Sequence, residues 1–528
     1  MSTEFPAPQS SVVADLLAQE FGLIPDLIGR HARARPDATA LVHRDERLTY
    51  GELDALMDRV AASLQRDGLK RGDTIAVCAS SSIPYAVTFL GALRAGVVVT
   101  PLAPSSSAEG LAAMIADSGA RIFFVDQGVA QSLGPFDDFA GEIVSLDGSD
   151  AGRPFTGWLA APGARPEPVS LERTSPFNII YSSGTTGVPK GIIQSHRMRW
   201  AHVQRGGIFG YGSDAVAVVS TPLYSNTTLV SFFPTLALGG AVVLMEKFDA
   251  EGFLTLAERH RATHAMLVPV QYKRIMDLPN FASFDLASFR MKFCTSAPFA
   301  ASLKADVLAR WPGGLVEYYG MTEGGGSCVL VAHEFPDKLH TVGRPSQGHD
   351  VRLIDETGQT VLQGEIGEVV GHSPAIMNGY HNQPAKTREA EWYAPDGRRF
   401  IRTGDVGRFD ADGFLTLMDR KKDMIISGGF NIYPSDIEAV LQSNEAIHDV
   451  AVVGLPSERW GETPVAFVVL KPGRGETAEA IREWANGRLG KIQRLAAVQL
   501  LEQLPRSPIG KVMKRELRDE FARVTEVA

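Results

Sequence analysis

Short apolar runs alternate with stretches of helical character through most of residues 40–420. The run at 73–78 follows a glycine, and the run at 241–245 follows a Gly-Gly turn, so both are predicted to be buried strands. Repeated strand–helix units of this kind predict an α/β fold in which layered sheets are mostly parallel.

Two segments show how the pattern sets local structure. At 48–53 the sequence opens a helix, because Thr49 is a natural N-cap and Glu52 stands at N3, which makes a capping box. At 85–104 the apolar stretch is interrupted by Arg94 and broken by prolines, so it predicts a buried helix and a strand. Runs of about 18 apolar residues are absent from the sequence, and membrane insertion is therefore not expected.

The pattern changes over residues 350–420, where Gly, Asp-Gly and Asn-Gly turns separate short strands and predict an antiparallel, barrel-like subdomain. A charge run at 419–423 indicates a domain boundary, although a solvated face is an alternative interpretation. We expect a large domain over 1–420 and a small α+β domain over 421–528. The small domain is predicted to have strands at 450–454 and 465–470 and helices at 434–442 and 478–490.

Composition narrows the classes of function. A length of 528 residues exceeds the usual size of one domain, and a net charge of −9 argues against nucleic acid as the main partner. Three widely spaced cysteines without a CxxC pair suggest neither a disulfide framework nor a zinc site. Residues 1–22 lack the basic start and apolar core of a signal peptide, so a cytoplasmic location is expected.

The segment 181–191 is the most informative about the chemistry of the protein. It reads Tyr-Ser-Ser-Gly-Thr-Thr-Gly-Val-Pro-Lys-Gly. Its small residues leave the backbone free to wrap an anion, and its hydroxyls and Lys190 can reach the oxygens of that anion. It follows an apolar run at 177–180 that predicts a strand, and nucleotide phosphates often bind at strand ends. It is not a Walker A loop, because Pro189 stands where the second glycine should be. A flexible linker would have no use for the Pro-Lys-Gly ending.

This loop resembles the signature of the class I adenylate-forming enzymes, which include acyl- and aryl-CoA synthetases, nonribosomal peptide adenylation domains and luciferase. The resemblance covers nearly the whole chain and implies ATP-dependent activation of a carboxylic acid as an acyl-adenylate, followed by acyl transfer. ATP, Mg²⁺ and coenzyme A are the implied cofactors. A small C-terminal domain is implied to move about a hinge at Lys422. The implied ATP contacts in the loop are Ser182, Ser183, Gly184, Thr185, Thr186, Gly187 and Lys190.

The segment 317–323 resembles the Y-G-x-T-E motif of the same family. The resemblance implies that Tyr319 stacks on adenine, that Thr322 contacts the α-phosphate and that Glu323 is a ligand for Mg²⁺. The remaining residues of the motif that are assigned to the nucleotide site are Glu317, Tyr318 and Gly320.

Three further segments complete the implied adenylation site. Ser296-Ala297-Pro298 resembles a G-A-P turn beside adenine and ribose, with Ser296 where glycine is commonest. The segment 402–405 resembles R-T-G-D, which assigns Asp405 to the ribose diol, and Arg420 follows as a second ribose contact. The segment 504–511 resembles P-x-x-x-x-G-K, in which Lys511 bridges the substrate carboxylate and the α-phosphate.

Coenzyme A is assigned to the C-terminal domain. Ser427-Gly428-Gly429 resembles the CoA-ligase version of its motif and has little side chain, so it is predicted to form one wall of a pantetheine tunnel. From the residues alone, a plain hairpin turn is the alternative. Trp460 is expected to pack on CoA and Arg494 to meet a CoA phosphate. The segment 492–495, Ile-Gln-Arg-Leu, departs from the aromatic-Lys-x-Pro of relatives and lacks their stacking aromatic.

The acid is predicted to bind near residues 221–228, which contain no acidic residue of the kind that holds a substrate ammonium. Ser225 stands where relatives often carry histidine, and three glycines at 324–326 are expected to leave room in the pocket wall. A mostly apolar pocket fits a medium-chain or aromatic carboxylate. The predicted acid-binding residues are Tyr224, Ser225, Asn226, Val268, Tyr272, Phe299, Gly324 and Gly325.

The leading hypothesis is therefore an AMP-forming acid:CoA ligase, a monomer or homodimer, with Lys190, Thr322, Glu323 and Lys511 as its catalytic residues. The first alternative is an adenylating enzyme of the same fold that passes the acyl group to the pantetheine of a carrier protein. A catalytically inert nucleotide-binding protein is the second alternative, which the intact set of charged motif residues disfavours.

Overall fold

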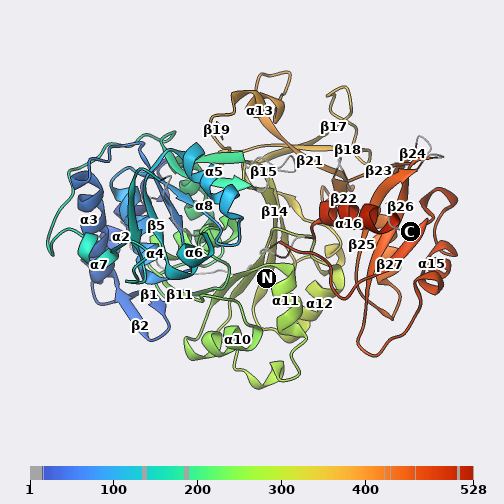
Figure 1. The fold of residues 1–528 in the computed structure, drawn as a ribbon, viewed down its shortest axis with the longest axis horizontal. Helices are drawn as coiled ribbons and strands as arrows, with labels where there is room; N and C mark the ends of the chain where they lie inside the picture. Colours follow the sequence, from blue (N-terminus) through green and yellow to red (C-terminus); the bar gives the residue numbers. More distant parts are fainter. Residues whose placement is uncertain are drawn as a thin grey trace. The chain divides into compact units, whose positions relative to one another are not determined.

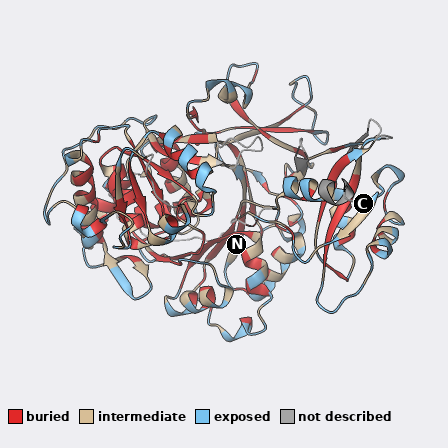
Figure 2. Cartoon of the chain, viewed as in Figure 1, coloured by how far each residue is buried: buried red, intermediate tan, exposed pale blue. Residues whose placement is uncertain are grey.

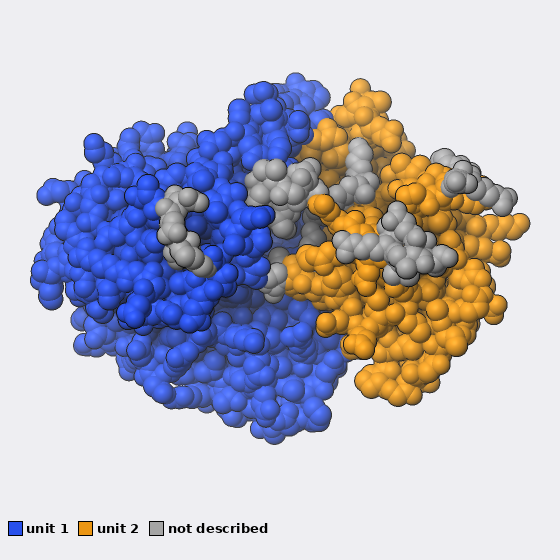
Figure 3. All heavy atoms as spheres, viewed as in Figure 1, with its two compact units in different colours: residues 1–340, 345–350, 371–401 blue, residues 341–344, 351–370, 402–528 orange. Residues whose placement is uncertain are grey.

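The computed structural model describes residues 15, 17–133, 139–182, 190–420, 423–427, 430–457, 460–507, 510 and 512–526. They form two compact units (Figure 3). Unit 1 contains the residues up to 340 together with 345–350 and 371–401, and unit 2 contains 341–344, 351–370 and the residues from 402 onward. The predicted domain boundary after residue 420 lies inside unit 2 and stays a prediction. In the described ranges, no helix is both long enough and apolar enough to cross a membrane.

A nine-stranded sheet forms one layer of unit 1 (Figure 1). Its interior strand pairs are parallel, and the antiparallel pairs β1–β2 and β14–β15 lie toward its two ends. In spatial order the strands are β16 (Arg344–Pro345), β15 (Gly324–Val331), β14 (Gly314–Met321), β13 (Met291–Cys294), β12 (His264–Leu267), β10 (Val216–Val219), β11 (Ala241–Leu244), β1 (Thr39–His43) and β2 (Glu46–Thr49).

An eight-stranded sheet forms a second layer. It is parallel from β4 to β7, while β8, β9 and β19 add antiparallel pairs at one end. In spatial order its strands are β19 (Gly379–Tyr380), β9 (Lys190–Ser195), β8 (Pro176–Ser182), β4 (Val98–Pro101), β3 (Thr74–Cys78), β5 (Ala120–Val125), β6 (Glu142–Ser145) and β7 (Arg153–Pro154). These two sheets confirm the prediction of mostly parallel α/β layers.

Helices pack between the two sheets and share the core with the strands. Helix α4 (Ile83–Arg94) contacts β4 of one sheet and β1 of the other, and nearly all of its residues are buried, as Figure 2 shows for this region. A helix that is apolar all round is stable only in such a position. The other helices of unit 1 are α2 (Ile24–Ala34), α3 (Tyr50–Arg66), α5 (Ala108–Ser118), α6 (Gln127–Leu133), α7 (Phe155–Trp158), α8 (His196–Ile208), α9 (Asn226–Ala237), α10 (Ala250–Arg259), α11 (Pro269–Met276), α12 (Ala301–Arg310) and α13 (Pro384–Glu389).

The segment predicted to be antiparallel contributes a five-stranded sheet. The pairs β20–β21 and β21–β22 are antiparallel, as predicted. The chain boundary between the units falls within β17, β18 and β21. The strands are β17 (Asp350–Ile354), β18 (Ile366–His372), β21 (Arg399–Phe409), β20 (Glu391–Tyr393) and β22 (Leu415–Arg420).

The C-terminal part of unit 2 is an α+β structure with its own core. Strands β23 to β26 pair antiparallel, and β27 pairs parallel with β26. This confirms the predicted small α+β region. Its elements are β23 (Ile425–Ser427), β24 (Phe430–Ile432), α14 (Pro434–Gln442), β25 (Ile447–Ser457), β26 (Gly461–Leu470), α15 (Ala478–Asn486), β27 (Ala497–Leu500) and α16 (Lys514–Glu526).

The predicted capping box is present at the start of α3. The Thr49 hydroxyl accepts a hydrogen bond from the Glu52 amide at 3.3 Å, and the Glu52 carboxylate accepts one from the Thr49 amide at 2.8 Å. The predicted strands at 73–78 and 241–245 are β3 and β11, each one residue shorter than expected. Local rules therefore placed these elements correctly.

Two histidines are buried in the core of unit 1 in their neutral form. His196 begins α8, and its ring meets the ring of Phe177 edge-on at 4.9 Å. His264 in β12 stacks on Tyr211 at 4.4 Å. Burial lowers the pKa of each histidine to about 4. Because an unfolded histidine takes up its proton near pH 6.5, each residue favours the folded state above that pH and loses this effect as the pH falls toward 4.

We therefore expect the stability of unit 1 to fall between pH 6.5 and pH 4. A single group with this shift accounts for about 3 kcal/mol at pH 4. The midpoints of urea unfolding, measured between pH 7.5 and pH 4.5, give the slope of stability against pH. His196→Leu is expected to make this slope shallower. The control is His448→Leu, since His448 is exposed and its replacement removes no buried group. An unchanged slope in His196→Leu would contradict the assignment.

Candidate active site

Strands β8 and β9 lie on either side of the predicted phosphate loop. They pair antiparallel, and Ser182 is the register partner of Lys190. The loop residues Ser183, Gly184, Thr185, Thr186 and Gly187 lie outside the described residues, and so does the side chain of Ser182. Their contacts with phosphate stay predictions.

Lys190 and Glu323, both predicted to be catalytic, meet at Tyr380. The Lys190 ammonium lies 5.1 Å from the centroid of the Tyr380 ring, and the Tyr380 hydroxyl donates a hydrogen bond to Glu323 Oε1 at 2.9 Å. Tyr380 is placed there because β19 pairs with β9, where Lys190 is the first residue. Burial, and after it the charge of Glu323, raises the pKa of Tyr380, so the hydroxyl remains a donor at neutral pH.

The turn between β14 and β15 carries Thr322 and Glu323, and three other residues hold it. The Gln194 side chain, at the end of β9, donates to the Thr322 carbonyl at 2.8 Å. The Met377 amide donates to the Glu323 carbonyl at 2.8 Å. With the Tyr380 hydroxyl, these bonds fix both the backbone of the turn and the carboxylate that it presents.

Contrary to the prediction from the sequence, the glycines after Glu323 do not leave room in a pocket wall. Gly324 and Gly325 both have φ of +75°, a conformation that favours glycine. A Cβ on Gly324 would lie 1.7 Å from the Ala375 carbonyl oxygen, and one on Gly325 would lie 2.9 Å from the Gly371 carbonyl oxygen. Glycine is needed here because backbone packs against backbone. The prediction of added pocket volume is wrong.

Gly324→Ala is therefore expected to destabilise the protein strongly. Left-handed backbone costs an alanine about 1–2 kcal/mol, and displacement of the Ala375 segment adds to this cost. The control is Gly348→Ala, where φ is +76° but nothing lies within 4 Å of the added Cβ. Urea midpoints should fall further for Gly324→Ala than for Gly348→Ala. Equal midpoints would show that the close approach to Ala375 is unimportant.

The three neighbouring residues 317–319 of β14 each lie in surroundings that differ from those of the other two. Glu317 is buried and forms an ion pair with the buried Lys304, and burial raises the pKa of Glu317 to about 7. The ring of Tyr318 stacks on Phe293 at 5.8 Å. Tyr319 faces the opposite side of the strand from Tyr318, because side chains alternate along a strand. Stacking of Tyr319 on adenine and the nucleotide contacts of Glu317, Tyr318 and Gly320 stay predictions.

Ser296 shows why glycine is common at its position. Its φ is +83°, and its hydroxyl lies 2.5 Å from the hydroxyl of Thr227 in α9. The hydrogen bond between these hydroxyls offsets part of the cost of a left-handed serine. It also joins the Ser296-Ala297-Pro298 turn to the segment that is predicted to bind the acid.

The residues predicted to bind the acid lie in two surroundings. Ser225 is the N-cap residue of α9, and Asn226 accepts a hydrogen bond from the Gln194 side chain at 3.3 Å. Tyr272 is fully buried, stacks on Phe299 at 5.1 Å and donates its hydroxyl to the Phe293 carbonyl at 2.9 Å. The apolar pocket and the contact of Tyr224, Val268, Tyr272 and Phe299 with an acid stay predictions.

In unit 2 the two residues that are predicted to bind ribose lie on paired strands, and their contact with ribose stays a prediction. Asp405 on β21 and Arg420 on β22 are register partners in an antiparallel pair. The predicted CoA residues Trp460 and Arg494 are exposed, and Ser427 pairs with Gly461, the residue after Trp460. Lys422, Gly428, Gly429 and Lys511 lie outside the described residues.

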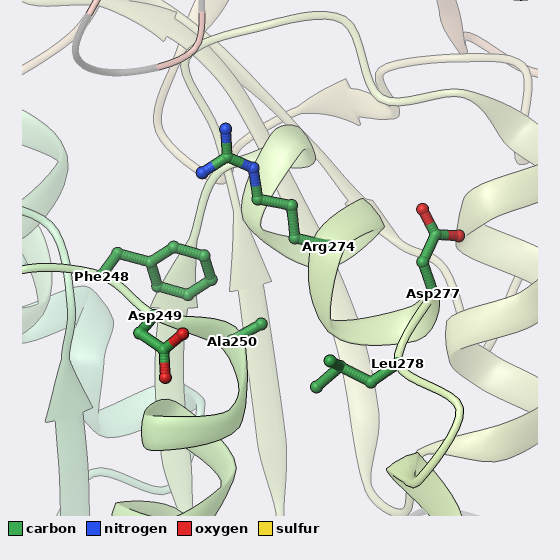
Figure 4. A pocket seen from close by; sticks show the side chains of 6 residues that line it. All are labelled: Phe248, Asp249, Ala250, Arg274, Asp277 and Leu278. Atoms are coloured by element: carbon green, nitrogen blue, oxygen red, sulfur yellow. The ribbon is translucent and has the colours of Figure 1, made fainter. Parts of the chain in front are cut away.

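A separate pocket of about 380 Å³ lies where α10 and α11 meet (Figure 4). It contains none of the predicted site residues. Its lining is Phe248, Asp249, Ala250, Arg274, Asp277 and Leu278.

Comparison with known families agrees with the fold and with the gathered motifs. Residues 28–381 match the family of AMP-binding enzymes, and residues 436–511 match the AMP-binding enzyme C-terminal domain. The chain belongs to this family, the class I adenylate-forming enzymes, and it is an enzyme.

Individual relatives cover almost the full length. A feruloyl-CoA synthase from Amycolatopsis sp is 34% identical over 93% of this chain and 98% of its own. A fatty acid–[acyl-carrier-protein] ligase, ScoC from Streptomyces coeruleorubidus, is 30% identical over 93% of this chain and 95% of its own. The structure of ATP-bound MatB from Rhodopseudomonas palustris is similar with a TM-score of 0.83 and 29% identity, covering 94% of this chain and 99% of that one.

Three residues that position the site were not found from the sequence. Tyr380 and Gln194 reach it through strand pairing between distant segments, and Arg205 reaches the ring of Tyr318 from the end of α8. No local motif marks any of them. Long-range pairing is the information that a single sequence does not carry.

Tyr380→Phe is expected to lower the rate of acyl-adenylate formation about tenfold or more, because a hydrogen bond to a charged group contributes roughly 1.5–3 kcal/mol. The ring beside Lys190 is retained in this variant. The control is Tyr393→Phe, which removes a hydroxyl bond to Glu391 of 3.0 Å at the surface. Acid-dependent release of pyrophosphate measures the effect. If both variants had wild-type rates, Tyr380 would not orient Glu323 for the reaction.

Proposed function

We propose that this enzyme is an ATP-dependent acid:CoA ligase that forms AMP. The observation that supports this most strongly is the gathering of Lys190, Glu323 and Thr322 around Tyr380 and Gln194. In the first half-reaction an oxygen of the acid's carboxylate bonds to the α-phosphorus of ATP, and pyrophosphate leaves. In the second, the CoA thiol loses its proton and its sulfur bonds to the acyl carbon, and AMP leaves.

The residues of unit 1 suit the charge that develops in the first half-reaction. The ammonium of Lys190 offers a positive charge at the end of the phosphate loop, and electrostatic stabilisation of this kind is usually the largest catalytic contribution. Gln194 and Met377 fix the backbone of the turn, so Thr322 needs little reorganisation to meet the α-phosphate. We assign to Asp405 and Arg420 the binding of the ribose.

Mg²⁺ fits the donor chemistry of this turn. Glu323 offers one carboxylate that Tyr380 orients, and Mg²⁺ typically binds one or two carboxylates together with phosphate oxygens and water. When bound, the ion would neutralise charge on the phosphates of ATP. The protein's own contribution is to hold the Glu323 carboxylate in one orientation.

The acid is assigned only to a broad class, medium-chain or aromatic carboxylates. The buried apolar side chains of Val268, Tyr272 and Phe299 support this assignment. A cytoplasmic location fits the three free, buried cysteines. A monomer or a homodimer is expected.

A carrier protein is the second candidate for the acyl acceptor, because ScoC, which is named a fatty acid–[acyl-carrier-protein] ligase, is 30% identical. The test is a panel of linear and aromatic acids with Mg-ATP and either CoA or a pantetheinylated carrier protein. AMP formation and the mass of the thioester are read out. Thioester formed with CoA supports the proposal, and thioester formed only with the carrier protein favours the second candidate. Acid-dependent pyrophosphate release with neither acceptor present would exclude an inert nucleotide-binding protein.

Lys511→Ala is expected to reduce acyl-adenylate formation by roughly 10²–10⁴, because it removes a positive charge where negative charge develops. Thioester formation from supplied acyl-adenylate is expected to persist, since we assign Lys511 to the first half-reaction alone. Pyrophosphate release and single-turnover thioester formation measure the two steps. The control is Lys471→Ala, an exposed lysine at the end of β26. Equal loss in both steps would refute the assignment to one half-reaction.

We assign Lys422 as the hinge about which the C-terminal domain moves between the first and the second half-reaction. A proline fixes φ, so Lys422→Pro should hold one arrangement of the C-terminal domain. We assign to this residue a rotation that brings the segment 427–429 to the site for the second half-reaction.

A further inference from the structure

One face of α8 carries three side chains that bear or can bear a positive charge. Arg199, His202 and Arg205 are spaced at i, i+3 and i+6, so they follow one another along the helix surface. We name these three residues the α8 cationic row. None of them forms an ion pair with a carboxylate of the described residues.

Arg199 is the deepest member of the row and is fully buried. Its guanidinium donates to Asn178 Oδ1 at 3.1 and 3.2 Å and to Gln194 Oε1, and both of these acceptors are neutral amides. Its Nη1 atom is buried and has no hydrogen-bonding partner in the described part of the chain. A buried charge that lacks a counter-charge is costly, so a compensating group is expected.

His202 lies one turn further along α8. Its Nδ1 atom is also buried without a hydrogen-bonding partner among the described residues. Burial holds the pKa of His202 well below its usual value, and Arg205, Arg199 and His349 lower it further. Within the described part of the chain, the charged groups that influence this ring are therefore all basic.

Arg205 ends the row beside the β14–β15 hairpin. Its guanidinium lies 4.6 Å from the centroid of the Tyr318 ring, and in the described ranges it forms no hydrogen bond or ion pair. His349 faces the same region, because its Nδ1 accepts a hydrogen bond from the Ser327 amide at 3.0 Å. Burial and, after it, the charge of Arg205 lower the pKa of His349. Ser327 lies on β15.

The α8 cationic row extends along the helix, away from the turn at Thr322 where the carboxylate of the acid is proposed to react. Gln194, two residues before α8, donates to both Thr322 and Asn226, whereas Arg205 meets Tyr318 near the other end of the helix. The six residue steps from Arg199 to Arg205 rise ~9 Å along the helix. This length is comparable to that of a medium-chain or aromatic acid.

We propose that the α8 cationic row receives a second anionic group of the acid substrate, most simply a carboxylate remote from the one that is adenylated. This inference rests on the proposed function. A carboxylate at Arg205 would form charge-assisted hydrogen bonds with the guanidinium, and it would supply the counter-charge that the row lacks. A purely apolar tail would leave Arg205 and Nδ1 of His202 without partners and would remove water from around them.

The test compares acids of equal length with and without a distal carboxylate: octanedioate against octanoate, and 4-carboxycinnamate against cinnamate. Acid-dependent pyrophosphate release gives kcat/KM for each acid. We expect the wild-type enzyme to prefer the diacid of each pair about tenfold or more, and Arg205→Met to reduce that ratio by a similar factor. Arg205→Lys should keep part of the preference. The control is Arg197→Met on the same helix, since Arg197 lies 3.6 Å from Glu20 and not in the row.

Binding of octanedioate and octanoate, measured by calorimetry without ATP, gives a readout that does not require catalysis. If turnover is too slow to measure, this binding comparison tests the proposal in place of kcat/KM. If Arg205→Met fails to fold, the same comparison is made with His202→Asn. Equal or weaker binding and turnover of the diacids, or an equal loss for all acids in Arg205→Met, would overturn the proposal. A preference for 4-hydroxycinnamate over 4-carboxycinnamate would overturn the anionic assignment. Diacid binding without any pyrophosphate release would support the row and refute the proposed ligase.

Discussion

The turn between β14 and β15 is the constraint on which the candidate site depends. Its backbone is held by the Gln194 side chain and the Met377 amide, and its carboxylate by the Tyr380 hydroxyl. Two glycines with positive φ allow the following strand to pass against Gly371 and Ala375. An adenylating site needs its phosphate-directed groups fixed before ATP arrives, because preorganised charge stabilises the transition state without reorganisation. Two segments that are distant in the sequence, at Gln194 and at 377–380, hold this turn in place.

The same segment that holds the turn also begins α8. Gln194 connects Thr322 and Asn226 to the guanidinium of Arg199, so the buried arginine supports the reacting end of the site while its neighbours extend along the helix. Burying Arg199 without a carboxylate partner among the described residues is expensive. A structural role alone does not explain why, among the described residues, Arg205 contacts only the ring of Tyr318. An anionic substrate group accounts for the cost at the place where the acid is proposed to lie.

Much of the fold was predictable because it follows local rules. The capping box at Thr49 and the apolar runs of β3 and β11 were placed to within a residue. Among the motif residues, Asp405 and Arg420 are register partners, and Lys190 and Glu323 both contact Tyr380, while their roles in the site stay predictions. What failed depended on tertiary packing. Gly324 was interpreted as empty space, whereas it marks a close approach of two backbones.

The positions of Tyr380, Gln194 and the α8 cationic row follow from strand pairing and helix packing that no short motif encodes. Glu317 illustrates the same limit, because its buried partner Lys304 lies on α12 and is not marked by any spacing in the sequence. Residues assigned by resemblance therefore need the structure before their roles can be separated. In the hairpin, Glu317 forms a buried ion pair, Tyr318 stacks on Phe293, and the Glu323 carboxylate accepts a hydrogen bond from Tyr380.

The central claim is that the carboxylate of an acid attacks the α-phosphorus of ATP. It is tested most directly by the fate of oxygen. The enzyme is incubated with Mg-ATP, CoA and one acid, which is octanoate, cinnamate or octanedioate labelled with ¹⁸O in the carboxylate. The ¹⁸O content of the nucleotide and phosphate products is then measured by mass spectrometry. The account predicts one ¹⁸O atom in AMP and none in pyrophosphate for every acid that is turned over. Label in inorganic phosphate together with ADP, or AMP without label, would contradict it.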